Sequence, residues 1–325
     1  MNVIKGFVAA LGYSFLTVLA PLLMWGLIGW LCVMCRTSVL AATVLVVLVS
    51  VYVGITYSLK RGRLRHGVRS EFFSNLRIWR WMGEHYRIGL EYTGAEPLDK
   101  GRHYIFGIHP HGVLALERYA FWGSRADRWD KVFPGIETRD LCATALMLVP
   151  GPRTWCLLTG AVLADRPVAS SILRDTPYSL LMYPGGEREQ MATEYGRDKV
   201  WVRRHRGFVR LALENGAPLV PCYMFGVTSQ YKISSFLGGF RTWLQRRFAV
   251  ALPLFYGLSP LLFWLPSGER PVTAVFGAPI EVERVEHPTD EQINEVMEKY
   301  VAALTKIYDD NKERFGCKDS TLEVI

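Results

Sequence analysis

The segment Tyr104–Gly112, with the sequence YIFGIHPHG, is an apolar run that ends in two histidines separated by a proline and closed by a glycine. The apolar part is typical of a buried strand. Pro110 makes the following turn rigid, and Gly112 permits a positive φ or a close approach of the backbone. Because imidazole accepts and returns protons near neutral pH, His109 and His111 are candidates for a catalytic centre. The alternative is a turn with one solvated and one packed histidine.

Short apolar runs that alternate with polar or helical segments predict the fold class. These runs are bounded by Gly or Pro, as buried strands often are, and comprise Tyr104–Ile108, Ser179–Tyr183, Pro218–Met224 and Pro271–Phe276. Between the middle two, Gly207–Glu214 has apolar residues at helical spacing, and Gly216 is the expected stop. The alternation predicts an α/β fold with a mixed, mostly parallel sheet flanked by helices.

A long helix is predicted towards the C-terminal end of the sequence. Thr289 and Gln292 form a capping-box pattern at its start. One apolar stripe at helical spacing follows from Ile293 to Tyr308, and Gly316 is the expected terminator. Such a stripe is typical of a helix that packs against a core.

Two long apolar runs near the beginning of the sequence predict a membrane-embedded hairpin. They cover about residues 7–34 and 39–59, and each is long enough to cross a hydrocarbon core of about 30 Å. Basic residues follow at once, beginning with Lys60 and Arg61, so the positive-inside rule places both termini in the cytosol. The expected domains are therefore a hairpin over residues 1–60 and a cytosolic domain over 61–325. A single long tilted span is the alternative.

A third apolar run, at residues 249–266, contains three prolines that argue against a straight transmembrane helix. The run suits a segment at the membrane interface or a hydrophobic wall for a lipid. A buried core loop is an equally good interpretation.

A second turn with polar chemistry has the sequence YPGGERE at residues 183–189. It begins with Tyr183, Pro184, Gly185 and Gly186. The two glycines let backbone N–H groups approach a ligand. Glu189 could orient a histidine or neutralise an imidazolium, as the acidic partner does in other acyl-transfer sites. The alternative is a tight turn with solvated charges.

A dense group of cations follows this turn. Its members are Arg203, Arg204 and Arg206, with Gly207 and Phe208 directly after them. Such a cluster could hold a polyphosphate or anionic headgroups through charge-assisted hydrogen bonds. It could also be a solvated basic face.

Several motifs are absent from the sequence. It has no G-x-S-x-G elbow, no phosphate-binding P-loop and no G-x-G-x-x-G after a strand, which argues against a serine hydrolase, an NTPase and a nicotinamide enzyme. The net charge of +8 suits nucleic acid, a membrane surface or an acidic ligand. No nucleic-acid-binding motif is visible, so nucleic acid is not an expected partner.

Taken together and in this order, the motifs resemble those of the type-2 diacylglycerol acyltransferase family. The matching blocks are His109–Gly112, Pro184–Glu189, Arg206–Phe208, Leu219–Pro221, Arg270–Thr273, Gly277–Ile280 and Glu286–Thr289. The likeness extends over about residues 70–325.

The resemblance implies an acyl-CoA:diacylglycerol O-acyltransferase that makes triacylglycerol. An acyltransferase that acts on monoacylglycerol or wax alcohol is the alternative, and a non-catalytic lipid-binding or droplet-coating protein is a further one. The implied partners are acyl-CoA, diacylglycerol and membrane lipids, and a homo-oligomer is compatible with the sequence. Acyl-CoA is expected as a substrate, with no further cofactor and no metal. The implied location is the endoplasmic reticulum membrane, with the catalytic domain in the cytosol, and lipid droplets.

The resemblance also implies roles for the candidate residues. One of His109 and His111 would be the general base, and the other would hold it or polarise the thioester carbonyl. Backbone N–H groups of Gly185 and Gly186 would stabilise an oxyanion, and the arginines would receive the CoA phosphates. Glycerolipid acyltransferases often carry Asp four residues after a histidine, but this chain does not. Glu189 or Glu117 is therefore the expected orienting acid.

Overall fold

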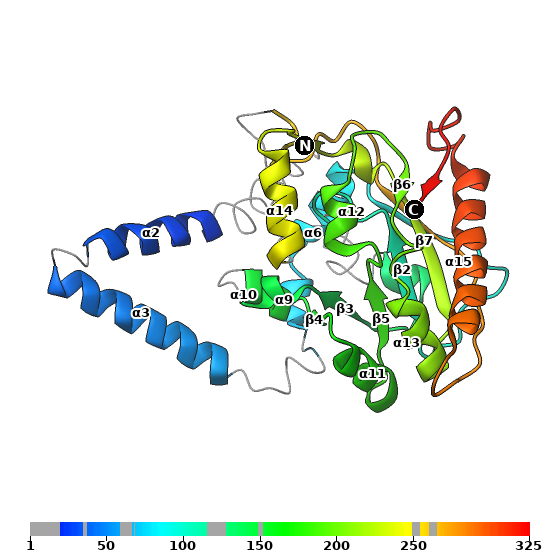
Figure 1. The fold of residues 1–325 in the computed structure, drawn as a ribbon, viewed down its shortest axis with the longest axis horizontal. Coiled ribbons are helices and arrows are strands. Elements are labelled where there is room, and N and C mark those ends of the chain that lie inside the picture. The colour runs from blue at the N-terminus through cyan, green and yellow to red at the C-terminus, as the bar shows by residue number, and fades with distance from the viewer. Residues whose placement is uncertain are drawn as a thin grey trace.

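The computed structural model describes most of the 325-residue chain. The described residues are 20–34, 38–58, 67, 69–115, 128–148, 152–248, 254–259 and 265–325. A central sheet is covered by helices on both faces, and the helices α2 and α3 extend away from it as a pair (Figure 1).

The central sheet has seven strands in the order β1-β10-β7-β2-β5-β3-β4. The strands are β1 (Gly89–Tyr92), β2 (Ile105–His109), β3 (Thr138–Cys142), β4 (Val162–Leu163), β5 (Ser179–Met182), β7 (Leu219–Phe225) and β10 (Thr273–Phe276). β2 pairs in parallel with both β5 and β7, and β10 runs antiparallel to β7. The predicted mixed, mostly parallel sheet is confirmed, and its four predicted strands lie within one or two residues of the observed ones.

Two short ladders lie outside this sheet. β6 (Lys199–Val200) pairs in parallel with β11 (Glu323–Val324), and β8 (Lys232–Ile233) pairs antiparallel with β9 (Phe255–Tyr256). β6 leads directly into the basic segment that follows residue 200.

Apart from α2 and α3, the helices connect the strands and lie around the sheet. They are α2 (Ala20–Met34), α3 (Val39–Ser58), α5 (Glu71–Ser74), α6 (Arg77–His85), α8 (Trp129–Val132), α9 (Thr144–Leu148), α10 (Pro152–Leu158), α11 (Arg166–Asp175), α12 (Gly186–Met191), α13 (Gly207–Asn215), α14 (Gly238–Phe248) and α15 (Asp290–Asn311), with a 3₁₀ turn at Val227–Ser229. α13 ends as predicted, because Gly216 adopts the left-handed conformation with φ of 61°.

α15 begins as the sequence predicts and ends earlier. Both hydrogen bonds of the capping box between Thr289 and Gln292 are present. The apolar stripe is buried, but the helix ends at Asn311, before the predicted stop at Gly316.

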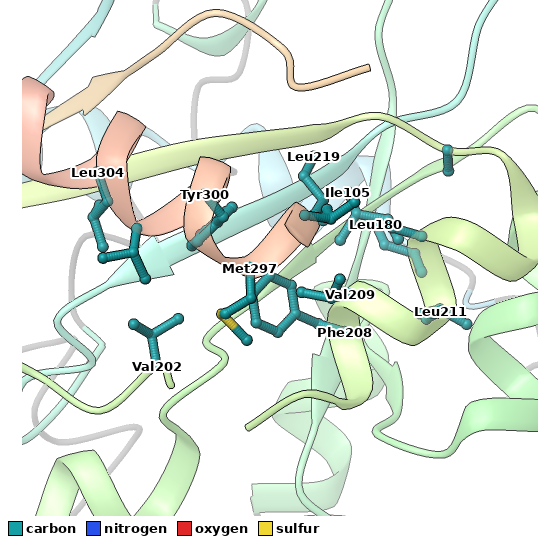
Figure 2. Packing of buried hydrophobic residues seen from close by; sticks show 14 of the residues in the cluster. Ile105, Leu180, Val202, Phe208, Val209, Leu211, Leu219, Met297, Tyr300 and Leu304 are labelled. Atoms are coloured by element: carbon teal, nitrogen blue, oxygen red, sulfur yellow. The ribbon is translucent and has the colours of Figure 1, made fainter. Parts of the chain in front are cut away.

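Strand β2 separates two hydrophobic clusters because successive side chains point to opposite faces. Phe106 and Ile108 lie in the cluster that contains many aromatic rings, and Ile105 lies in the other. Figure 2 shows this second cluster, in which side chains of α13 and α15 pack over the strands. By the same alternation, His109 belongs to the face that α15 covers.

The prediction of a transmembrane hairpin is wrong. Across the described ranges, no helix combines the length and the apolarity that crossing a membrane requires. α2 has 15 residues, a rise of about 22 Å, which is less than the hydrocarbon core of about 30 Å. The sequence-based expectation extended this helix back to about residue 7, and residues 1–19 lie outside the described part of the chain. The alternative of a single long span fails on the same finding.

The predicted interface segment at residues 249–266 is described only in part. Phe255 and Tyr256 form β9, and residues 249–253 and 260–264 lie outside the described residues. Lys60 and Arg61, on which the orientation depended, also lie outside them. The interface segment and the division at residue 60 stay predictions.

Candidate active site

His109 is the last residue of β2 and is completely buried. Its Nδ1 atom lies 3.5 Å from Oε1 of Glu189, at the upper limit for a hydrogen bond. Its Nε2 atom is buried and has no hydrogen-bond partner among the described residues. Because a neutral imidazole has one donor and one acceptor nitrogen, Nε2 can accept a proton when Nδ1 carries the hydrogen.

Glu189 lies in the first turn of α12 and is 2% exposed. Its Oε2 atom accepts a hydrogen bond from the backbone N–H of His111 at 3.2 Å, and its Oε1 atom accepts one from the backbone N–H of Trp201 at 3.1 Å. Each carboxylate oxygen is therefore held by a main-chain donor. A buried carboxylate needs such partners, and these two fix its plane beside His109.

The Pro-Gly-Gly turn places α12 so that Glu189 folds back over its own N-terminus. A β-carbon on Gly185 would overlap the Glu189 carboxylate, so only glycine fits there. Gly186 has φ of 51°, a region that glycine enters without strain. The N–H of Gly186 donates to the carbonyl of Tyr183 at 3.0 Å and serves the turn itself. Within the described chain, the N–H of Gly185 has no hydrogen bond.

The turn after β2 is tied to α12 and to the 3₁₀ turn. The His109–Pro110 peptide bond is cis, and Gly112 has φ of 63°. A β-carbon on Gly112 would lie 2.7 Å from Cγ2 of Val227, so the close approach that the sequence predicted does occur. Gln190 of α12 donates to the carbonyl of Val113 at 2.6 Å. The histidine-bearing turn and the glutamate-bearing helix therefore form one unit.

The two histidines occupy different environments. The His111 ring is partly buried, with Nδ1 3.1 Å from the carbonyl of Gly112, and its centroid lies 4.9 Å from that of Tyr183. His111 reaches Glu189 through its backbone N–H, whereas His109 reaches it through its imidazole. The structure thus places the imidazole of His109 beside the carboxylate.

Tyr300 of α15 supports the end of β2 from the covered face. Its hydroxyl donates to the carbonyl of Gly107 at 3.0 Å, and its ring centroid lies 6.0 Å from that of His109. Burial, with smaller contributions from Cys222 and Glu189, raises the pKa of Tyr300 well above its usual value. The phenol therefore stays protonated and keeps donating.

The predicted arginines lie on the surface beside α15. Arg203 pairs with Glu298, and Arg206 donates to Oδ1 of Asn294 at 2.7 Å and lies 3.5 Å from Asp290. Arg204 lies 5.8 Å from the centroid of the Trp201 ring. These ion pairs are solvent-exposed, and such pairs are weak enough for a phosphate to compete with them. The arginines do not contact His109 or Glu189, and their role in CoA binding stays a prediction.

The remaining predicted residues are structural neighbours of the site. Gly207 opens α13, and Phe208 is 3% exposed with its ring centroid 4.9 Å from that of Tyr300. Pro184 lies against β2, since a β-carbon on Gly107 would be 3.4 Å from its Cγ atom. Glu117 falls in residues 116–127, which lie outside the described part.

Trp201 is the residue that sequence reasoning missed. Its backbone N–H donates to Glu189, and its buried indole Nε1 atom has no hydrogen-bond partner in the part of the chain that the structure describes. No local pattern marks it, because the contact is made by the main chain of a segment twelve positions away. Its position directly after β6 could have indicated a role, but a strand of two residues is too short to be predicted from the sequence.

An apolar cavity lies next to the histidine turn. Leu114, two residues beyond Gly112, lines it together with Val227, Ile88 and Val272. Its lining also includes Tyr86, Pro266 and the polar side chain of Gln230. In the ranges that the structure describes, no group of three or more His, Cys, Asp or Glu side chains is placed to hold a metal ion.

Comparison with known proteins decides the family. The diacylglycerol acyltransferase family model matches residues 38–325. The chain belongs to this family. It is 32% identical over 273 residues to diacylglycerol O-acyltransferase 2 of Bos taurus, with 79% of this chain and 74% of the relative covered. The human protein of that name is 31% identical, with 79% of this chain and 69% of the relative covered.

A second kind of acyltransferase is similar to the same degree. Human 2-acylglycerol O-acyltransferase 3 is 30% identical over 270 residues, which cover 78% of this chain and 77% of that protein. The crystal structure of a 1-acyl-sn-glycerophosphate acyltransferase from Thermotoga maritima aligns with a TM-score of 0.41 and 15% identity, over 93% of this chain and 96% of that one. As a member of the diacylglycerol acyltransferase family, the chain is an O-acyltransferase.

Proposed function

We propose that the enzyme transfers a fatty acyl group from acyl-CoA to the free hydroxyl of diacylglycerol, with His109 as general base and Glu189 as the acid that orients it. The assignment of these roles rests on the buried pair formed by His109 and Glu189. Nδ1 of His109 faces the carboxylate, and none of the described residues hydrogen-bonds to Nε2. A proton on Nδ1, directed at Glu189, leaves Nε2 as the acceptor that a general base needs.

In the proposed reaction, Nε2 takes the proton of the acceptor hydroxyl while the hydroxyl oxygen attacks the thioester carbonyl carbon. The resulting oxyanion would be stabilised by the N–H of Gly185, which has no partner among the described residues, unlike that of Gly186. Collapse of the intermediate forms the ester bond and breaks the thioester bond. CoA leaves as a thiolate, whose thiol has a reference pKa of about 8.5, and takes the proton back from the imidazolium.

His111 then has a supporting role in this proposal. Its backbone N–H fixes Oε2 of Glu189, and its ring rests beside Tyr183. The enclosure of His109 also limits hydrolysis, because water that reached the base would compete with the acceptor for the acyl group.

Diacylglycerol is the proposed acceptor because relatives named for that acceptor resemble the chain over most of its length. Monoacylglycerol is the second candidate, since human 2-acylglycerol O-acyltransferase 3 is similar to almost the same degree. Wax alcohol is a third, which the assay below includes.

A lipid surface is the proposed place of action, at the cytosolic side of the endoplasmic reticulum and on lipid droplets. α14 supports this proposal, because Phe240 and Trp243 are 53% and 54% exposed and stack on each other with ring centroids 5.8 Å apart. Leu237, just before the helix, is 55% exposed. A contiguous apolar surface of this kind marks an interaction site, and aromatic side chains suit a membrane interface.

The test is an assay of the full chain in microsomes with labelled acyl-CoA and, in parallel, diacylglycerol, monoacylglycerol and long-chain alcohol. Triacylglycerol is the expected main product. His109→Ala and Glu189→Gln should each lower the rate by about 10²–10⁴-fold, whereas the exposed His287→Ala should leave it unchanged. Absence of ester product with every acceptor would overturn the proposal, and an active His109→Ala variant would overturn the choice of base.

A further inference from the structure

The second donor to Glu189 comes from a segment outside the central sheet. Trp201 follows β6 directly, and its N–H reaches Oε1 of the carboxylate at 3.1 Å. This is the oxygen that faces His109. The position of Trp201 therefore decides how the carboxylate is presented to the imidazole, and three sets of contacts hold Trp201 in place.

The first set is the parallel pairing of β6 with β11. The N–H of Glu323 donates to the carbonyl of Asp198, and the N–H of Ile325 donates to the carbonyl of Val200, both at 2.9 Å. The N–H of Arg203 donates in turn to the carbonyl of Ile325 at 2.9 Å. These three bonds enclose Trp201 on both sides along the chain.

The second set centres on the carboxylate of Asp198. Its two oxygens accept hydrogen bonds from the hydroxyls of Tyr223 and Tyr308, each at 2.7 Å. Burial first, and then the charge of Asp198, raises the pKa of Tyr223 well above its usual value, so this phenol remains a donor. Asp198 is thereby fixed to β7 through Tyr223 and to α15 through Tyr308.

The third set is the packing of Val202 on the opposite side of Trp201. Val202 is fully buried, and it belongs to the cluster drawn in Figure 2, which also contains Met297 and Leu304 of α15. The main chain around Trp201 is thus anchored at residues on both sides of it.

The contacts close a ring around the candidate site. Tyr223 is the register partner of His109 on the neighbouring strand. Tyr223 binds Asp198, the segment from Asp198 leads to Trp201, Trp201 binds Glu189, and Glu189 faces His109. The sheet register that places the imidazole therefore also places the donor that orients its carboxylate.

We propose that Asp198, Tyr308 and the β6–β11 pair are positioning elements that fix the Glu189 carboxylate against His109. This inference rests on the function proposed above, in which Glu189 orients the base. It makes residues far from the histidine motif part of the catalytic apparatus without contact with substrate. Small displacements of a catalytic group are known to cost large factors in rate.

The experiment compares kcat and the KM for acyl-CoA in the full chain carrying Tyr308→Phe, Asp198→Asn or a deletion of residues 323–325. Each change should lower kcat by about tenfold or more, with KM within about twofold of the wild-type value. Two matched controls should leave kcat unchanged. Tyr195→Phe removes a phenol–carboxylate contact with Glu269, and Lys306→Gln removes the exposed 2.8 Å ion pair with Asp310 on the helix that carries Tyr308.

The same changes are then made in the Glu189→Gln variant, whose residual rate serves as the reference. If the elements act through Glu189, each should now cost less than about twofold, because coupled residues are not additive. Equal losses in both backgrounds would show a merely structural role and overturn the inference. Unchanged kcat in Tyr308→Phe, with Glu189→Gln inactive, would also overturn it.

A fully active Glu189→Gln variant would instead overturn the proposed function, so the two failures are distinguishable. If the deletion does not fold, Tyr308→Phe carries the test, since it removes one oxygen atom from a residue that stays packed. Circular dichroism and thermal unfolding identify that case.

Discussion

A β-carbon on Gly185 would overlap the carboxylate of Glu189, one turn further along α12. The φ of Gly185 is −68°, which any residue can adopt, so the demand at this position is for space and not for an unusual backbone. The first turn of α12 is therefore shaped around the side chain that it presents to His109.

Gly185→Ala should displace Glu189 and lower kcat by about tenfold or more, because the added methyl group takes the place of the carboxylate. The assay is acyl transfer from acyl-CoA at saturating acceptor. Gly239→Ala is the control, since a β-carbon there would meet no heavy atom within 4 Å. Wild-type kcat in Gly185→Ala would show that Glu189 is not needed where the structure places it.

Tyr300→Phe should lower the free energy of unfolding by about 1–3 kcal/mol, because the buried carbonyl of Gly107 loses its phenol donor. Urea unfolding followed by circular dichroism measures the change. Tyr256→Phe, at a position that is 37% exposed, should differ from wild type by no more than about 0.5 kcal/mol. Equal stability of Tyr300→Phe and wild type would contradict the inferred hydrogen bond.

Stability should fall steeply above about pH 10 because Tyr223 and Tyr300 are fully buried phenols with pKa values well above the usual one. Below that pH, both the folded and the unfolded chain hold the phenolic protons, so these groups do not change the free energy of unfolding. Above it, the unfolded chain releases them while the folded chain retains them, so each tyrosine costs about 1.4 kcal/mol per pH unit.

Urea unfolding at a series of pH values from 8 to 11.5 measures this slope. Tyr300→Phe should show a shallower slope, by the contribution of one phenol. A slope that this substitution leaves unchanged would mean that Tyr300 does not contribute to the alkaline loss.

Thr289→Ala should lower the free energy of unfolding by about 1 kcal/mol, because it removes the N-cap of α15. The hydroxyl accepts from the N–H of Gln292 at 3.3 Å. Thermal unfolding measures the effect, with the exposed Thr242→Ala as control. If Thr289→Ala unfolds at the same temperature as the wild type, packing of the apolar stripe alone stabilises this end of the helix.

Local patterns predicted the strands and the C-terminal helices well because their signals are local. Apolar runs ended by Gly or Pro predicted β2, β5, β7 and β10, and the pair Thr289 and Gln292 predicted the start of α15. The antiparallel direction of β10 was not predictable, since strand pairing is decided by partners far away in the sequence. The membrane hairpin was wrong because apolar composition alone was taken to predict spanning helices, and no helix in the described ranges has the required length and apolarity.

The candidate site was likewise predictable only in part. His109 and Glu189 each end or follow an apolar strand, and the parallel pairing of β2 with β5 brings these strand ends together. Which histidine meets the carboxylate depended on the turn geometry, which the sequence left open. Trp201 contributes through its main-chain N–H, which almost every residue type has. The identity of the side chain therefore does not indicate this contact.

The insertion of β10 between β1 and β7 has a consequence for synthesis on the ribosome. The hydroxyl of Thr93, just after β1, donates to the carbonyl of Phe276, 183 positions later. While the nascent chain emerges, β1 has no partner and β7 has an open edge until β10 follows. Exposed strand edges invite pairing with other chains. The edge of β7 that β10 covers in the finished fold therefore stays open to other chains until residues 273–276 have been made.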